Sequence, residues 1–309
     1  MQKTVLITGG TGMIGERLSQ LLLEKGCIVR HLSRRRNVNA EFQTFFWDYE
    51  ATEIDADALD GVHYVVHLAG ANVAGSRWTN AYKKEIIDSR TKTTALLERV
   101  IEQQIREKTS KLEAFISASA VGIYGDTGSK IADETSEIGT TFLAKVCSAW
   151  EDSVQNITNL TVRTVVLRIG IVLSTKGGAL QKLLPTYRVG VGTYFGNGSL
   201  FTPWIHIDDL CSMLIIAMEN KNYTGIYNAV SPTMTTGKNL AKAVAIALNK
   251  PNSILIGVPK FILNLAMGEM SSMLFENSRV LPTRTIATGF QWKYADLAKA
   301  IEHLLENKT

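Results

Sequence analysis

Short apolar runs alternate with longer segments of helical periodicity through the first half of the chain. The pattern predicts strands at residues 4–8, 27–32, 44–48, 62–69, 114–119 and 162–168, and helices between Ile14 and Gly26 and at residues 80–108 and 141–155. Strands that alternate with helices are typical of a parallel sheet covered on both faces. We therefore predict an α/β protein with a doubly wound parallel sheet, the Rossmann fold.

The pattern changes beyond residue 174, where helices and short strands alternate irregularly around a glycine-rich loop at residues 190–198. We therefore expect a Rossmann domain over residues 1–174 and a smaller C-terminal α/β lobe over residues 175–309, with some return of the chain to the Rossmann sheet. The lobe would pack over the carboxyl edge of the sheet. The cleft between the two is then the expected substrate site.

Composition narrows the class of protein. Hydrophobic residues make up 45% of the 309 residues, charged residues 20%, and the net charge is +4. Because lysines and arginines are scattered, we expect neither a nucleic-acid surface nor a membrane surface. Cys27, Cys147 and Cys211 lie far apart and form no Cys-x-x-Cys pair, which predicts no metal site, no disulfide and a reducing, cytoplasmic location.

The most informative motif is a glycine loop between the first strand and the first helix. Gly9, Gly12 and Gly15 follow the apolar run Thr4–Thr8 at a spacing of Gly-x-x-Gly-x-x-Gly. Glycine lets the backbone turn tightly and approach an anion, while the N–H groups of the first helical turn point at that anion. Strand, glycine turn and helix together predict a site for the diphosphate of a dinucleotide.

A basic run at the end of the second strand indicates which dinucleotide, NAD or NADP, the site prefers. Sites that prefer NAD usually carry an acidic residue there. This chain has Ser33-Arg34-Arg35-Arg36 instead, and no carboxylate lies between Glu24 and Glu41. Because arginine pairs well with a phosphate, we expect NADP as the cofactor, the alternative being a solvated basic loop.

Several further short segments along the chain are informative together with the glycine loop. They lie at residues 67–71, 77–78, 117–125, 142–144, 150–151, 204–209, 268–270, 279–282 and 289–290. With the glycine loop they resemble the extended short-chain dehydrogenase/reductase superfamily, in its epimerase/dehydratase branch. The resemblance is closer still to an atypical epimerase-like family of obscure function with a C-terminal domain of unknown function, and it runs nearly end to end.

The resemblance implies a role for particular residues along the cofactor. The diphosphate would be held by Gly9, Thr11, Gly12, Met13, Ile14 and Gly15, and the 2′-phosphate by Ser33, Arg34 and Arg35. The adenine would be flanked by Trp47 and Asp48, and the middle of the cofactor would be lined by Leu68, Ala69 and Gly70. The nicotinamide would be approached by Ile169 and Val172. A homodimer formed through the two long helices is implied in the same way.

The usual catalytic pair of the superfamily is missing. Relatives use Tyr-x-x-x-Lys on the helix after the fifth strand, where the lysine lowers the pKa of the tyrosine. If Glu151 takes the place of the glutamate that often follows, Cys147 stands at the lysine position and Leu143 at the tyrosine position. Lys145 is two residues from both Leu143 and Cys147 in the sequence. This separation is about 200° round a helix, so we expect Lys145 on the opposite face.

Several side chains are candidates for the missing role. Ser119 is the predicted catalytic residue, through a hydrogen bond to the reacting oxygen, although extra spacing before Tyr124 leaves Ala120 as an alternative counterpart. We expect Tyr124 to pack below the site and Cys147 to be a small buried hydrophobe.

Three other segments contain residues that are candidates for a structural or a functional role. We expect His67 to be a hydrogen-bonded core residue and Asp208, after His206, to be a helix N-cap. Arg77-Trp78 could face the cleft and meet an anionic or planar substrate group, or could belong to a surface loop anchored by Trp78.

Two hypotheses about function follow. The first is an NADP(H)-binding, epimerase-like oxidoreductase with an altered active site that acts on an unidentified small molecule. The alternative is a non-catalytic NADP-binding sensor or scaffold.

Overall fold

The computed structural model describes residues 2–35 and 41–306. Its centre is an eight-stranded sheet in the order β11-β7-β6-β5-β1-β2-β3-β4. Neighbouring strands run parallel, except that β4 is antiparallel to β3. The strands are β1 (Thr4–Thr8), β2 (Ile28–Ser33), β3 (Gln43–Asp48), β4 (Glu53–Ile54), β5 (Tyr64–His67), β6 (Ala114–Ala120), β7 (Thr164–Ile169) and β11 (Gly225–Ala229).

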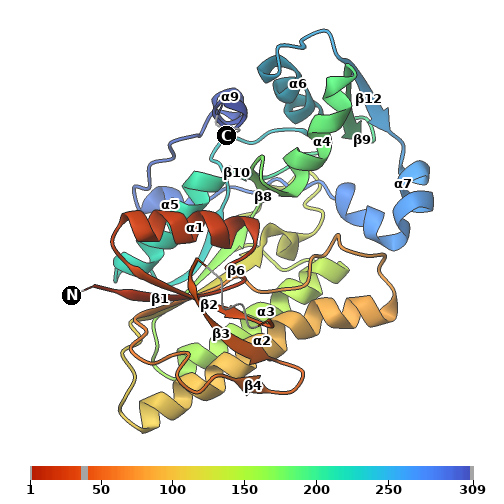
Figure 1. Cartoon of the computed structure of the whole chain (residues 1–309). Coiled ribbons are helices and arrows are strands. Elements are labelled where there is room, and N and C mark those ends of the chain that lie inside the picture. Colours follow the sequence, from red (N-terminus) through yellow and green to blue (C-terminus); the bar gives the residue numbers. More distant parts are fainter. Residues whose placement is uncertain (1, 36–40, 307–309) are drawn as a thin grey trace.

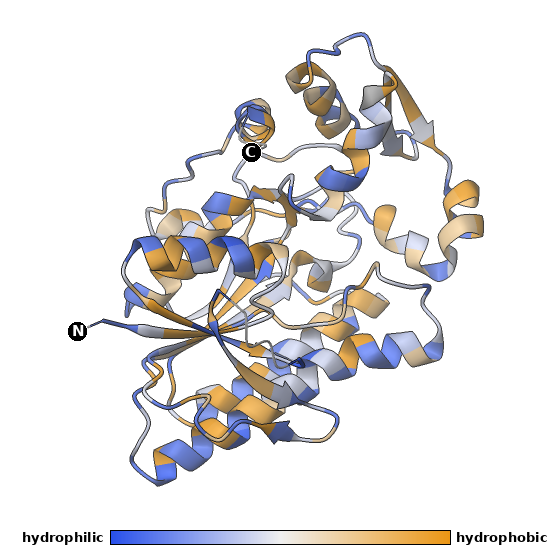
Figure 2. Cartoon of the chain, in the orientation of Figure 1, coloured by the Kyte–Doolittle hydropathy of each residue, from blue (hydrophilic) through white to orange (hydrophobic). Residues whose placement is uncertain are grey.

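Helices cover both faces of this sheet (Figure 1). Helices α1 (Met13–Glu24) and α5 (Ile207–Glu219) pack together on one face, and α2 (Asn80–Arg106) and α3 (Phe142–Asn159) pack together on the other. Strands β1, β5 and β7 are buried along their whole lengths, as their continuous apolar runs require. Figure 2 shows the outer face of α1 as largely hydrophilic. The predicted doubly wound sheet is confirmed.

The direction of the chain reverses beside β1. The chain moves outward from β1 to β2 and β3, then returns to place β5 on the other side of β1. In such sheets this reversal opens a crevice at the carboxyl ends of the strands. Strand β5 ends at His67, earlier than predicted, because the N–H groups of Leu68 and Ala69 donate to the side chain of Thr8.

The chain beyond residue 169 both extends the sheet and forms further strands and helices outside it (Figure 1). Strand β11 joins the sheet beside β7. Outside the sheet, β8 (Ile171–Leu173) pairs with β10 (Trp204–His206), and β9 (Val191–Phe195) pairs with β12 (Ile254–Val258). The remaining elements are η1 (Val121–Tyr124), α4 (Gly178–Arg188), α6 (Gly237–Ala247), α7 (Lys260–Met267), η2 (Gly268–Leu274), α8 (Thr283–Ala287) and α9 (Leu297–Glu306).

None of the helices in the described part of the chain combines the length and the apolar character needed to cross a membrane.

Candidate functional site

The glycine loop between β1 and α1 is shaped by close backbone approaches. Gly9 has a φ of +70°, and the N–H of Gly12 donates to its carbonyl at 3.0 Å. A Cβ on Gly15 would overlap the carbonyl oxygen of Gly9 and lie 2.6 Å from the Cα of Gly10. Only glycine therefore lets α1 begin so close to the strand. Because Gly12 caps α1 without a side-chain hydrogen bond, the first-turn N–H groups remain available to an anion.

The three other residues of the predicted diphosphate site lie in the loop and in the first turn of α1. Thr11 is exposed, whereas Met13 and Ile14 are half-buried. The Met13 side chain lies beside the turn after β8, where a Cβ on Gly177 would be 3.2 Å from its sulfur. Met13 thus links the glycine loop to the C-terminal half of the chain.

A buried histidine supports the loop from behind. The ring of His31 lies against Gly10, where a Cβ would come within 2.5 Å of the imidazole. Its Nε2 is 2.8 Å from the hydroxyl of Ser19, which itself donates to the carbonyl of Gly15. The Ser19 oxygen therefore accepts from His31 Nε2–H. Burial lowers the pKa of His31 to about 4, so the ring is neutral near pH 7.

The described residues of the predicted 2′-phosphate site lie at and directly after the end of β2. Arg34 and Arg35 are exposed at the end of β2, and the hydroxyl of Ser33 accepts the N–H of Arg35 at 3.1 Å. Arg36, the last residue of the basic run, lies outside the described residues.

The two residues predicted to flank the adenine have different surroundings. Trp47 is buried, with its ring edge-on to His67 at 6.4 Å. Asp48 is partly exposed and accepts the backbone N–H groups of Glu50 and Ala51. Its carboxylate therefore closes the turn after β3.

Thr8 and His67 fix the backbone where β1 and β5 end. The Thr8 hydroxyl accepts the N–H groups of Leu68 and Ala69 at 3.1 and 3.0 Å, so its own proton goes to His67 Nδ1 at 2.8 Å. Burial lowers the pKa of His67 to about 3. The expectation of a hydrogen-bonded core histidine is confirmed. The network shapes residues 68–70, which come directly after it.

A cavity of about 300 Å³ lies at the carboxyl ends of β6 and β7. Ala120 and Ile169, the last residues of these strands, line it, whereas Val172 is buried in β8 outside the lining. Leu143 and Cys147 on α3 also line it, and Lys145 is exposed. No tyrosine is among the lining residues in the described part of the chain. The α3 side chains of Leu143 and Cys147 therefore present neither a phenol hydroxyl nor an amino group to the cavity.

Cys147 offers no replacement nucleophile. Burial raises the pKa of its thiol to about 11, so it is protonated at neutral pH. This agrees with the expected small hydrophobe.

Ser119 lies behind the cavity wall. Its side chain is buried and its hydroxyl donates to Glu151 Oε1 at 2.7 Å. Glu151 in turn forms a bidentate ion pair with Arg168, at 2.9 and 2.8 Å. Although burial disfavours the charge on Arg168, the hydrogen bonds and charge of Glu151 raise its pKa. Ala120, the alternative counterpart, is the one of the two that lines the cavity.

Tyr124 packs below the site, as expected. Its hydroxyl donates to Asn228 Oδ1 at 2.7 Å and accepts from Arg168 at 2.9 Å. The residue is buried in a small cluster with Val121 and Ile123. Tyr124 is therefore part of the support for the cavity.

Two charged residues line the cavity that sequence reasoning missed. Arg90 on α2 lies over the ring of Trp150 at 5.1 Å and donates to the carbonyls of Ala71 and Ile86. Its helical spacing from the apolar Ile86 was the signal that could have placed it on the buried face. Glu276 reaches the same cavity from the segment after η2. No local pattern marks Glu276.

The loop that holds Arg77 and Trp78 is anchored by hydrogen bonds to Val73, which lines the cavity, and to α7. Trp78 is buried and donates through Nε1 to the carbonyl of Val73 at 2.8 Å. Arg77 donates to the carbonyls of Leu265 and Ala266 in α7. Neither residue lines the cavity, so the anchored-loop alternative describes this segment.

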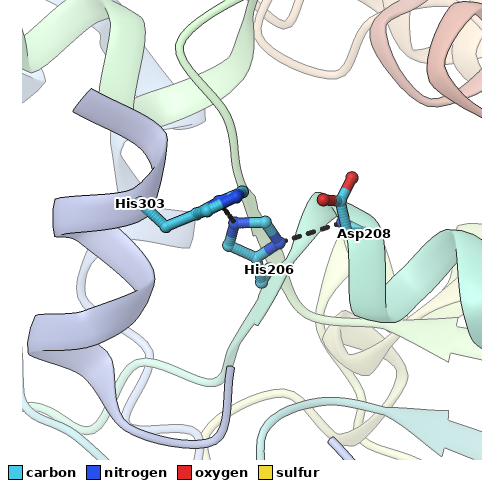
Figure 3. A group of neighbouring side chains, drawn as sticks. All are labelled: His206, Asp208 and His303. Carbon is cyan, nitrogen blue, oxygen red and sulfur yellow. Dashed lines mark hydrogen bonds between the residues drawn. The ribbon is translucent and has the colours of Figure 1, made fainter. Parts of the chain in front are cut away.

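A second polar cluster joins α5 to α9. His206, Asp208 and His303 place three candidate ligand atoms within 4.8 Å of one another (Figure 3). The expectation that Asp208 caps α5 was wrong: His206 is the N-cap, and its Nδ1 accepts the N–H of Asp208 at 3.0 Å. A ring nitrogen can take this role because the imidazole is neutral, burial lowering the pKa of His206 to about 4.

The hydrogen bonds of this cluster disfavour a metal ion. Since His206 Nδ1 accepts a hydrogen bond, its proton is on Nε2, facing His303 Nδ1 at 3.2 Å. A histidine that binds a metal through one ring nitrogen usually donates a hydrogen bond through the other. If His206 bound a metal through Nε2, its Nδ1 would have to donate, but Nδ1 faces the N–H of Asp208. Arg17 also holds the Asp208 carboxylate at 2.6 Å. With the His206 ring stacked on Tyr294, the cluster fastens the C-terminal segment to α5.

The buried histidines predict a pH dependence of stability. The pKa values of His31 and His67 are lowered in the folded state to about 4 and about 3. The unfolded chain therefore binds more protons as the pH falls below 6.5, and the free energy of unfolding falls with it. For His31 the loss between pH 6.5 and 4 is about 3 kcal/mol. Urea unfolding across this range measures it.

A matched variant isolates this contribution. His31→Gln retains a side-chain N–H donor for Ser19 and has no titrating group, so its stability should fall less steeply between pH 6.5 and 4. Equal slopes for the two proteins would contradict the assignment.

Comparison with known proteins agrees with this geometry. The NAD dependent epimerase/dehydratase family matches residues 5–229, and a domain of unknown function (DUF1731) matches residues 258–304. Epimerase family protein SDR39U1 of Mus musculus is 34% identical over 305 residues, covering 97% of this chain and 99% of that protein. An epimerase family protein of Mycobacterium leprae is 31% identical over 300 residues, covering 97% and 94%.

Solved structures agree as well. The crystal structure of human SDR39U1 (isoform 2) with NADPH is 31% identical and has a TM-score of 0.86, covering 98% of this chain and 99% of that one. UDP-N-acetylglucosamine 4-epimerase from Bacillus cereus shares the fold, with a TM-score of 0.78 at 17% identity. This chain belongs to the NAD dependent epimerase/dehydratase family, within the short-chain dehydrogenase/reductase superfamily of NAD(P)-binding Rossmann proteins.

Proposed function

We propose that the chain is an NADP(H)-binding, epimerase-like oxidoreductase that acts on a small molecule in the cavity beside β6 and β7. The observation that carries the choice of cofactor is the pair of exposed guanidinium groups of Arg34 and Arg35 at the end of β2. Within the described residues neither forms an ion pair, so both are available to a 2′-phosphate. The NADPH bound by human SDR39U1 supports this choice.

The remaining cofactor contacts follow the crevice. The diphosphate would lie against residues 9–15, and residues 68–70 would line the middle of the cofactor. The nicotinamide would reach Ile169 at the cavity, where a bound ring supplies or accepts a hydride. Apolar side chains such as Leu143 and Phe201 would exclude water from that end. Ser119 would act through Glu151, as a positioning residue behind the wall.

Titration with NADPH and NADH tests the choice of cofactor. We expect the chain to bind NADPH at least about tenfold more tightly than NADH, which corresponds to about 1.4 kcal/mol for the 2′-phosphate contacts. The double variant Arg34→Ala, Arg35→Ala should lose this preference, because the phosphate then has no paired cation. Calorimetric titration measures both affinities.

The NADH affinity of the double variant is the internal control. It should remain within about twofold of the unmodified chain, because NADH has no 2′-phosphate. Equal, weak binding of both cofactors by the unmodified chain would refute the role of the arginines.

The alternative, a non-catalytic NADP-binding sensor or scaffold, is motivated by Leu143 and Cys147 at the catalytic positions of α3. Tight NADPH binding without stereospecific hydride loss to any carbonyl or alcohol in a broad panel would favour it. Hydride loss to one such compound would exclude it.

A further inference from the structure

We propose that Glu276 transfers the proton in this cavity, and that it serves the carbonyl oxygen of an apolar aldehyde or ketone. The inference rests on the proposed function, because it requires the nicotinamide of NADPH beside Ile169. Glu276, Ile169 and Leu143 line the same cavity. Glu276 is its sole carboxylate among the residues that the structure describes.

The carboxylate reaches the end of α3 from which the usual tyrosine would act. Thr141 is the N-cap of that helix, and its Oγ1 accepts the N–H of Ala144 at 3.2 Å. Its side chain is near enough to Glu276 to favour the charged form of that carboxyl group and so lower its pKa. Leu143, at the expected tyrosine position, is the second residue of α3 and lines the same cavity as Glu276. A carboxyl group from the C-terminal region thus shares a cavity with the position from which the tyrosine would act.

The backbone around Glu276 is held from two sides. The carbonyl of Asn277 accepts the N–H of Thr127 and its Oδ1 accepts the N–H of Phe201, both at 2.8 Å. Ser278 donates its N–H to the carbonyl of Phe201 and its hydroxyl to the carbonyl of Gly125. These bonds hold the backbone that follows Glu276 between the loop after η1 and the loop before β10. A fixed carboxyl is what proton transfer requires.

The protonation of Glu276 suits this role. Burial raises its pKa to about 7, against the opposing effect of Thr141, and the charge of Asp126 raises it further. A carboxyl group with such a pKa holds a proton and releases it near neutrality. Among the described residues, Arg90 and Cys147 also line the cavity, Arg279 lies over the ring of Phe201, and Lys260 lies over the ring of Phe275.

The lining of the cavity defines the substrate class. Most of its side chains are apolar, among them Val73, Leu143, Ile171, Phe195, Phe201 and Leu274. A sugar would leave hydroxyl groups unpaired against this wall, at a desolvation cost that an apolar compound avoids. When NADPH is bound, its nicotinamide supplies the hydride to the carbonyl carbon. Glu276 gives its proton to the carbonyl oxygen, the C=O bond becomes an alcohol, and water reprotonates the carboxylate.

The first test measures the carboxyl group itself. The full chain labelled with [5-¹³C]glutamate and loaded with NADP⁺ should show one carboxyl resonance that titrates near pH 7 and disappears in Glu276→Gln. Glu269→Gln, an exposed glutamate on η2 paired with Lys83, should leave that resonance in place. Asp126→Asn should move its midpoint to lower pH. A Glu276 midpoint below pH 5 would overturn the proposal.

The second test measures the reaction with 4-nitrobenzaldehyde. Glu276→Gln should lower kcat for NADPH oxidation at least 100-fold while the Kd for NADPH changes less than twofold. Glu269→Gln should leave both the kcat and the Kd unchanged. An unchanged kcat in Glu276→Gln, or no reduction of the aldehyde by the NADPH-bound unmodified chain, would overturn the proposal. Failure of the chain to bind NADPH would instead refute the proposed function.

Discussion

Replacing Glu151 with alanine is expected to lower the free energy of unfolding by about 3–5 kcal/mol, because it leaves a buried guanidinium without its counter-charge. Glu151 and Arg168 form a bidentate pair whose side chains are only 10% and 5% exposed. The substitution also removes the acceptor of the Ser119 hydroxyl. Chemical denaturation, read as midpoint and slope, measures the loss.

Two control variants separate a buried charge from a general effect of removing a glutamate. Glu50→Ala breaks an exposed ion pair with Lys92 at 3.6 Å and should cost less than about 1 kcal/mol. The double variant Glu151→Leu, Arg168→Met should recover most of the stability, since no charge then remains buried. A loss below about 1 kcal/mol for Glu151→Ala would show that the pair is solvated.

Gly15→Ala is expected to weaken NADPH binding at least about 100-fold, equivalent to about 2.7 kcal/mol. The added Cβ would overlap the Gly9 carbonyl oxygen and the Cα of Gly10, both of which are backbone atoms. The loop must then move away from the helix, and the first-turn N–H groups lose their alignment with the diphosphate. Titration with NADPH measures the loss, and circular dichroism verifies that the variant is folded.

Gly237→Ala is the matched control for this substitution. Gly237 is the first residue of α6, and an added Cβ would be 4.0 Å from the hydroxyl of Thr202, in ordinary contact. We expect unchanged NADPH binding and a change in stability within about 1 kcal/mol. Binding by Gly15→Ala as tight as that of this control would contradict the proposed diphosphate site.

Elements with strong local signals were predicted closely. The helix predicted at residues 80–108 is α2, Asn80–Arg106, which begins after Thr79, whose side chain accepts the N–H of Tyr82. The strand predicted at residues 114–119 is β6, Ala114–Ala120. Helical spacing also placed Leu143 and Cys147 on one face of α3, and both line the cavity. Each feature depends on neighbours within one or two helical turns, which is the range over which sequence periodicity acts.

Local reasoning failed where a distant residue supplies the partner. Asp208 has the side chain of a helix cap, yet His206 caps α5 because its ring is stacked on Tyr294 from the C-terminal segment. No local pattern indicated that the hydroxyl of Ser119 donates to Glu151 on α3, and its catalytic role stays a prediction. In both cases the partners of the side chain are set by which distant groups burial brings within reach.

The amino-acid sequence by itself determined the doubly wound sheet, the glycine loop and the basic turn after the second strand, because strand and helix periodicity and glycine's conformational freedom are properties of neighbouring residues. Only the tertiary structure decided what lines the cavity. Arg90 on α2 and Glu276 in the segment after η2 both line it, although they are far apart in the chain. Their shared place depends on how helices and loops pack on the sheet, and no local pattern encodes that packing.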